Sequence, residues 1–140
     1  MMFSPAKGND IEFYPYVDVT YWPLFNFDDA LNNGIKNFTL AFVNSAGECS
    51  PKWGTFNEYM IDSPNLNMSE KIQNIKEHGG DAFIAFGGAA AGENELPAVC
   101  NTVDELVEAY REVIVYNTDS QRKASDYLEW LLTRESNLRE

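Results

Sequence analysis

The sequence predicts an α/β fold in which three parallel strands are joined by crossover helices and followed by a C-terminal helix. Three apolar runs, at 11–22, 37–43 and 81–86, alternate with stretches of helical periodicity. The second and third runs are almost continuously apolar, which is typical of strands buried on both faces of a parallel sheet. The β-α-β-α-β-α order favours right-handed crossovers. Three strands leave two open edges, so we expect part of a larger sheet or barrel, or an oligomer that covers the edges.

Individual residues indicate where the predicted strands and helices begin and end. Pro15 and Pro23 restrict the regular length of the first strand, because proline cannot donate to a sheet ladder. A short helix follows, capped by Asn26 and ended by Gly34. Two longer helices begin with residue pairs of the capping-box type: Asn67 with Glu70, and Thr102 with Glu105. Apolar residues then recur at helical spacing: Met68, Ile72 and Ile75 in the first, and Val103, Leu106, Val107, Tyr110, Val113 and Ile114 in the second.

The character of the chain changes after Tyr116. Residues 117–140 are polar and mixed in charge, and they predict a final amphipathic helix from Ser120 to about Arg134. Its apolar face would carry Tyr127, Leu128, Leu131 and Leu132. The sequence therefore divides into a main unit over 1–116 and a C-terminal helical segment over 117–140.

Composition narrows the classes of partner. The 140 residues are 44% hydrophobic and carry a net charge of -12, which is enough apolar material for one core. Nucleic acid and anionic membranes are disfavoured, because both bind through Lys and Arg; a neutral ligand such as a sugar is not. No apolar run approaches a membrane-spanning length, and the first residues lack a signal-peptide pattern. The chain is either cytoplasmic or lacks its targeting segment, so its localisation stays open.

Two sequence features leave alternatives open. Cys49 and Cys100 could form a disulfide in an oxidising compartment, but two thiols far apart in sequence do not decide it. Gly87 and Gly92 have the spacing of a phosphate-binding loop, yet Glu93 follows where lysine should reach the phosphates. The glycine turn is then either a strand end that allows close backbone approach, or part of a site for another ligand.

Several segments together resemble glycoside hydrolase family 18, in its bacterial chitinase branch. "DAFIAFGGAAAG" is similar to the family's third barrel strand with its S-x-G-G motif, although Ala85 stands where serine is usual. "YPYVDVTYWPLFNF" resembles the first strand and its loop, and "NFTLAFV" with "CSPKWG" the second. The resemblance covers about residues 13–116. It implies a partial (β/α) TIM-type barrel, chitin or N-acetylglucosamine oligomers as ligand, no cofactor, and relatives that are usually secreted.

The candidate binding residues follow the predicted strand ends, where parallel α/β sheets hold their ligands. Trp22, Trp53 and Phe86 could stack on sugar rings, with core packing as the alternative for each. Gly87 and Gly88 would make room beneath a sugar. Asp18 lies among apolar neighbours in the first strand, so it either points into the site or is a hydrogen-bonded structural residue.

The resemblance also implies a catalytic motif that this sequence lacks. The family's fourth strand carries D-x-x-D-x-D-x-E, whose glutamate protonates the glycosidic oxygen in a substrate-assisted reaction. Acidic residues after Tyr116 do not reproduce it: Asp119, Asp126 and Glu129. A deletion joining two helices, or truncation with an unrelated tail, would explain the loss. We therefore predict no catalytic residue in this chain and no hydrolysis by it alone.

Other chemistry has little support in the sequence. His78 lies at a predicted helix C-terminus, where the dipole favours a structural role. No His/Cys cluster has metal-ligand spacing. Glu93 and Glu95 flank the glycine turn as possible acids, with nothing to indicate burial. The second hypothesis is a non-catalytic carbohydrate-binding or self-assembling module, for which a homo-oligomer would cover the open sheet edges.

Overall fold

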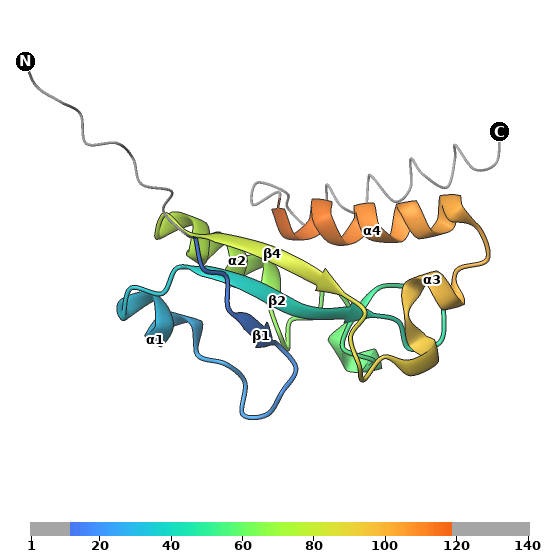
Figure 1. Cartoon of the computed structure of the whole chain (residues 1–140), viewed down its shortest axis with the longest axis horizontal. Coiled ribbons are helices and arrows are strands. Elements are labelled where there is room, and N and C mark those ends of the chain that lie inside the picture. Colours follow the sequence, from blue (N-terminus) through green and yellow to red (C-terminus); the bar gives the residue numbers. More distant parts are fainter. Residues whose placement is uncertain (1–11, 119–140) are drawn as a thin grey trace, which may run out of the picture.

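A computed structural model describes residues 12–118 of the chain (Figure 1). The described chain contains both strands and helices, and two single-turn 3-10 helices, Asn57–Tyr59 and Gly92–Asn94, lie in the longer loops. The elements are β1 (Tyr16–Asp18), α1 (Phe27–Asn32), β2 (Asn37–Asn44), β3 (Lys52–Trp53), α2 (Met68–Glu77), β4 (Asp81–Phe86), α3 (Leu96–Val99) and α4 (Val103–Thr118).

Strand β2 is the centre of the sheet. It pairs in parallel with β1 on one side and with β4 on the other, so the three predicted parallel strands are confirmed. Strand β3 was not predicted; it pairs antiparallel with the end of β2, Val43 opposite Trp53, and makes the sheet mixed. Two residues between Pro51 and Gly54 are too few to show a period of their own.

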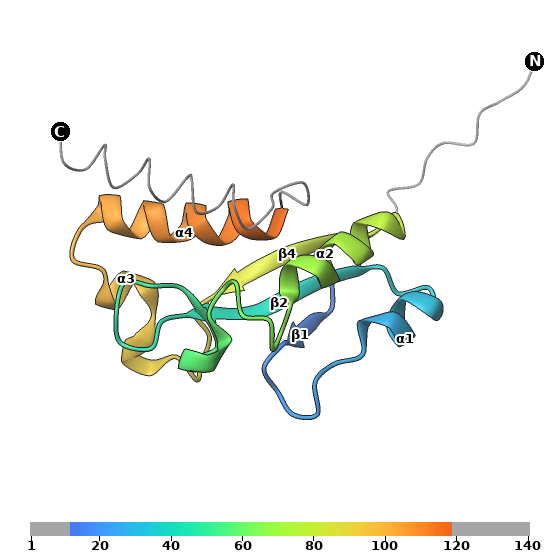
Figure 2. The ribbon, with the colours of Figure 1, turned by 180° about the vertical axis from the view of Figure 1, so that it is seen from behind.

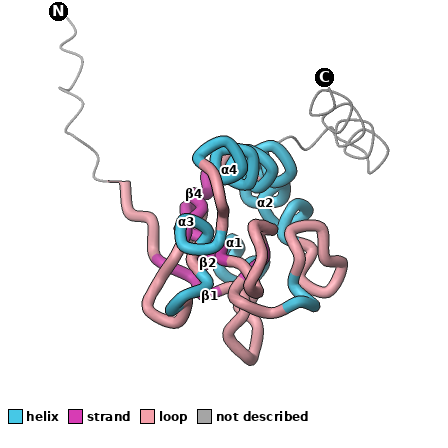
Figure 3. The backbone as a smooth tube through the Cα atoms, turned by 90° about the vertical axis from the view of Figure 1, so that its right-hand side faces the viewer, coloured by secondary structure: helices cyan, strands magenta, loops and turns pink. Residues whose placement is uncertain are grey.

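One face of the sheet carries the hydrophobic core. Val17, Leu40 and Ile84 are register partners across β1, β2 and β4, so their side chains share this face. Helices α1, α2 and α4 lie along it, as the views from behind and from the end show (Figures 2 and 3). The buried helical residues in the same cluster are Phe27, Ala30, Leu31, Met68, Ile72, Ile75, Ala109 and Val113.

The opposite face of the sheet has no helix over it in the described part of the chain. Its register row is Tyr16, Thr39 and Phe83, and Tyr16 and Phe83 remain 69% and 55% exposed. Tyr14 stacks on Phe83 with ring centroids 4.4 Å apart. Sheet strands in α/β folds are normally covered on both faces, so this row is an exposed apolar surface of the described residues.

The capping residues in the sequence predict where the helices begin, but only some of them form the predicted cap. Asn26 caps α1 as predicted, its Oδ1 accepting from the backbone N–H of Asp29 at 3.0 Å. Thr102 Oγ1 likewise accepts from Glu105 N–H at 3.1 Å. The capping box at Asn67 is wrong, because Asn67 has a left-handed backbone (φ 50°) and donates its side-chain amide to the Glu70 carboxylate. Helix α2 begins in the predicted place without that cap.

One further prediction needs correction. The first strand is only three residues long, not the run over 11–22. Pro97 occupies the first turn of α3, where its missing N–H costs nothing. The apolar residues of α4 divide between two sides: Leu106, Tyr110 and Val113 join the core, while Val103, Val107 and Ile114 are exposed.

The C-terminal segment can be followed only at its start. Helix α4 continues through Tyr116 to Thr118, so the proposed boundary at 116/117 does not coincide with an element end. The helix predicted over 120–134, with the acidic residues Asp119, Asp126 and Glu129, lies outside the described residues. Within 12–118 there is no helix that is both long and apolar enough to cross a membrane.

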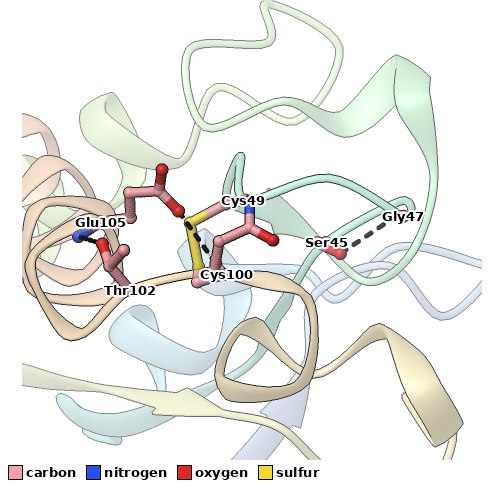
Figure 4. The surroundings of a disulfide bond; sticks show 7 residues. Ser45, Gly47, Cys49, Cys100, Thr102 and Glu105 are labelled. Atoms are coloured by element: carbon pink, nitrogen blue, oxygen red, sulfur yellow. Dashed lines mark hydrogen bonds between the residues drawn. A yellow bond between two sulfur atoms is a disulfide. The ribbon is translucent and has the colours of Figure 1, made fainter.

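The two cysteines are bonded. Cys49 and Cys100 form a disulfide with an S–S distance of 2.01 Å and Cα atoms 4.6 Å apart (Figure 4). It links the loop between β2 and β3 to the end of α3, across 51 positions of sequence. Beside it, Ser45 N–H donates to the carbonyl of Asn94 at 2.9 Å, so both loops beyond the sheet are held together. The question that the sequence left open is thereby decided.

Candidate functional site

A cavity of about 260 Å³ lies at the carboxyl ends of the three parallel strands. Asp18 ends β1, Phe42 lies near the end of β2, and Gly87 follows β4 directly. The loops after β1 and β3 and the turn after β4 complete the wall. The full lining is Asp18, Thr20, Tyr21, Trp22, Phe42, Gly54, Thr55, Phe56, Gly87 and Ala90. The cavity is therefore where ligands bind in parallel α/β folds.

Asp18 is both hydrogen-bonded and open to the cavity. Its Oδ1 accepts from the backbone N–H of Thr20 at 3.0 Å and from the Thr20 hydroxyl at 2.9 Å. Among residues 12–118 no hydrogen bond reaches its Oδ2. The two interpretations of Asp18 are thus compatible: one oxygen orders the loop after β1, and the other is available to a ligand.

Aromatic rings form much of the cavity wall. Trp22 is 80% exposed, and its neighbour Tyr21 is exposed as well. Phe56 approaches from the loop after β3, and Phe42 from the sheet itself. Aromatic faces of this kind provide apolar contact area while leaving hydrogen-bonding groups of a ligand in water.

The glycine pair after β4 brings backbone into the site. Gly87 and Gly88 have φ angles of +87° and +103°, which side-chain-bearing residues rarely adopt. A Cβ atom on Gly88 would lie 2.8 Å from the Phe42 ring. Gly87 is held on both sides, because its N–H donates to Val43 at 3.0 Å and its carbonyl accepts from the Asn44 amide at 2.9 Å. Glycine at both positions therefore lets the turn pack against the end of β2.

The structure corrects the prediction for Trp53 and decides the alternatives for Phe86. Trp53 is 0% exposed, because the antiparallel pairing of β3 with β2 places its ring in the core. Its faces cannot meet a sugar in this structure. Phe86 is half-buried and packs edge-on against Tyr110 of α4, with ring centroids 4.6 Å apart. Of the predicted aromatic residues, only Trp22 lines the cavity.

Sequence reasoning missed several residues of the wall: Thr20, Tyr21, Phe42, Gly54, Thr55, Phe56 and Ala90. Phe42 lies inside a nearly continuous apolar run, so nothing distinguished it from core residues. Tyr21 and Phe56 had a usable signal, since each follows a strand closely and lies in a polar loop. The same criterion had selected Trp22.

His78, Glu93 and Glu95 lie at different distances from the glycine turn, and only Glu95 reaches it. His78 ends α2, with Nδ1 2.8 Å from the carbonyl of Asn74, in keeping with a structural role. Glu93 is exposed in a 3-10 helix. Glu95 is also exposed, but its carboxylate reaches back over the glycine turn: Oε1 would lie 3.2 Å from a Cβ on Gly87. Within 12–118 no three His, Cys, Asp or Glu side chains are grouped to hold a metal ion.

Two other hollows exist in the described region. One of about 240 Å³ adjoins the cavity and shares Asp18 and Tyr21 with it. The other, of about 570 Å³, lies between α1 and α2 and is lined by polar residues. It includes Lys71, where burial lowers the pKa and the nearby Asp28 and Glu70 carboxylates partly offset that effect. This larger hollow is on the helical side, away from the strand ends, and we do not assign it a ligand.

Known proteins related to this chain are chitinases. It is 35% identical over 115 residues to a probable bifunctional chitinase/lysozyme of Escherichia coli, and 32% identical over 113 residues to endochitinase 11 of Metarhizium anisopliae. Each match covers 79% of the chain. The chain is chitinase-like. It spans only 12% and 20% of the length of these two relatives, and no family model matches it.

Solved structures agree with the chitinase-like sequence. The catalytic domain of a hyperthermophilic chitinase from Pyrococcus furiosus superposes with a TM-score of 0.62, at 28% identity over 74% of the chain. Catalytic-site mutants of active domain 2 of a chitinase from the same organism superpose equally well, at 27% identity. In both cases the match covers 33% of the solved chain. The chitinase-like chain is thus similar in fold to about one third of such a solved chain.

Proposed function

We propose that this chitinase-like chain is the N-terminal part of a family 18 type (β/α) barrel that binds β-1,4-linked N-acetylglucosamine oligomers without hydrolysing them. One observation carries the proposal: the ends of β1, β2 and β4 converge on a single cavity that contains Asp18, Trp22 and Gly87. The sequence predicts all three residues for this site. The chitinase relatives supply the ligand class.

Binding would use the cavity wall in two ways. The exposed faces of Trp22 and Tyr21 would stack on the apolar face of a pyranose ring, with Phe42 and Phe56 as further apolar contacts. The Oδ2 of Asp18 would accept a hydrogen bond from a sugar hydroxyl or an acetamido N–H. Gly87, without a side chain, lets the Glu95 carboxylate approach the end of β4 beside the cavity.

Hydrolysis would need an acid that this chain does not supply. No run in the 140 residues matches D-x-x-D-x-D-x-E, and protonation of the glycosidic oxygen requires a positioned general acid. The uncovered face around Tyr16 and Phe83 fits the same proposal, since the interior of a closed barrel is filled by side chains from all its strands.

Retention on chitin beads tests the proposal. Trp22→Ala should lower retention strongly, because it removes the largest exposed ring of the cavity. Phe83→Ala is the matched control: it also removes an exposed ring, but on the open sheet face outside the cavity. Equal retention of Trp22→Ala and wild type would contradict binding at this cavity. Release of shorter sugars from chitin oligomers by the pure chain would contradict the absence of hydrolysis.

The alternative function is a self-assembling, non-catalytic carbohydrate-binding module. The observation that favours it is the open face, where Tyr16 and Phe83 expose apolar surface beside two sheet edges that have no partner strand among residues 12–118. Sedimentation of the purified chain distinguishes the two functions. A stable dimer that dissociates in Phe83→Lys favours assembly, and a monomer at all concentrations excludes it.

A further inference from the structure

We infer that the cavity prefers cationic amino sugars, so that glucosamine-bearing, partly deacetylated oligomers bind more tightly than fully acetylated ones. This inference rests on the proposed function, since it concerns the same cavity and the same class of polymer. It arises from the distribution of charge around the cavity, which the assignment to chitin oligomers does not use.

The cavity wall contains negative charge and no positive charge. Asp18 is the one residue of the lining that is charged at neutral pH, and no Lys, Arg or His belongs to the lining. The free Oδ2 of Asp18 suits an ammonium group better than a neutral amide, because a charge-assisted hydrogen bond is roughly twice as strong. Lys52 lies two residues before Gly54, but it is buried and does not line the cavity.

A second carboxylate lies beside the opposite wall. The Oε1 of Glu95 would be 3.2 Å from a Cβ on Gly87, so the Glu95 side chain extends over the turn that follows β4. In the part of the chain that the structure describes, no hydrogen bond or ion pair is found for this carboxylate. Asp18 ends β1 and Gly87 follows β4, and these strands flank β2. The two acids therefore lie on either side of the central strand.

Aromatic rings reinforce the same preference. An ammonium group near the face of Trp22 or Tyr21 would gain a cation–π attraction that an acetamido group lacks. The whole chain carries 22 acidic and 10 basic residues, so the long-range field also attracts cations. Stacking alone would treat the two sugars alike, because both present the same ring face. A difference in affinity between the two sugars thus measures the contribution of the carboxylates and the cation–π contacts.

Calorimetric titration at mildly acidic pH and low salt tests the inference. The tetramer of glucosamine should bind roughly tenfold more tightly than the tetramer of N-acetylglucosamine, as expected for exposed ion pairs and cation–π contacts acting together. The advantage should shrink as salt is added, because these charges are screened. Asp18→Asn and Glu95→Gln should each reduce the advantage severalfold. Glu93→Gln, an equal change of charge in the same loop but away from Gly87, should leave it intact.

Three results would overturn the inference while leaving the proposed function standing: equal affinity for the two tetramers, tighter binding of the acetylated one, or a glucosamine advantage that Glu93→Gln removes as effectively as Glu95→Gln. Tetralysine serves as a general polycation. If it binds as tightly as the glucosamine tetramer, or if Trp22→Ala leaves glucosamine binding unchanged, the attraction is not specific to the cavity. If neither sugar tetramer binds, the proposed function falls as well.

Discussion

The two faces of the sheet differ in solvent exposure more than the sequence of the strands suggests. On the helical face, Val17, Leu40 and Phe38 are buried within one cluster that includes α1, α2 and α4. On the other face, the alternate residues Tyr16 and Phe83 are exposed, and no helix of the described part covers them. Strands β1 and β4 thus bury side chains, wholly or partly, on the helical face and expose others on the second face, whereas the central strand β2 is buried on both, at Leu40 and at Ala41. The cavity lies at the end of that second face.

The stability of the fold and the binding of a ligand depend on different residues. Residues that hold the unit together point away from the cavity, and the residues of the cavity belong to strand ends and loops. Substitutions should therefore affect either the free energy of unfolding or the affinity for ligand, with little overlap between the two sets. The predictions below start with the largest expected effect.

A pair of phenylalanine truncations tests the difference between the faces directly. Phe38→Ala, at a fully buried position of β2, should lower the free energy of unfolding by about 3–5 kcal/mol. Phe83→Ala, on the open face, should cost about 1 kcal/mol or less, mostly through the lost stacking on Tyr14. Urea unfolding followed by circular dichroism measures both. Comparable losses for the two variants would mean that the open face is covered in solution.

Much of the helical face could be predicted from the sequence, because its signals are local. Asn26 and Thr102 mark helix starts by chemistry within three residues, and the run over 37–43 gives β2 almost to its ends. The site could be predicted only in part. The position of Trp53 depends on β3 pairing with a strand eight residues earlier, and Phe42 is indistinguishable from core residues in a continuous apolar run. Those features depend on tertiary contacts that no local period encodes.

The disulfide should have the next largest effect on stability. Replacing both Cys49 and Cys100 with Ala opens a loop of 51 positions, which the chain-entropy relation values at about 4 kcal/mol. The loss should appear as a lower urea midpoint of the double variant, and reduction of the wild type should reproduce it. If reduced and oxidised chains unfold at the same urea concentration, the linked loops contribute nothing to the stability of the helical side.

The cap of α4 should have a smaller, local effect. Thr102→Ala removes the hydroxyl that accepts from Glu105 N–H and should cost about 1 kcal/mol. Thr102→Ser keeps the hydroxyl and should retain most of that stability. Thermal unfolding of the two variants gives the comparison. A loss as large in Ser as in Ala would assign the effect to the methyl group and not to the cap.

The smallest effect concerns Lys71 on α2. Burial lowers its pKa below 10.5 in the folded chain, so the protonated form is disfavoured by folding. Between the lowered pKa and 10.5 the unfolded chain binds more protons, and the stability contributed at this site rises with pH. The unfolding free energy of wild type relative to Lys71→Met should therefore increase over that range. A difference that stays constant or falls with pH would contradict burial of the ammonium group.

Titration of the chain with the tetramer of N-acetylglucosamine in a calorimeter, for wild type and Trp22→Ala, tests the central claim most directly. Trp22 is 80% exposed and makes no contribution to the core cluster, so its removal should leave the unfolding midpoint unchanged. We expect saturable binding by the wild type and at least tenfold weaker binding by Trp22→Ala. The tetramer should be recovered intact after both titrations. Equal binding by the two proteins, or no binding by wild type, would show that the cavity at the strand ends is not a chitin-oligomer site.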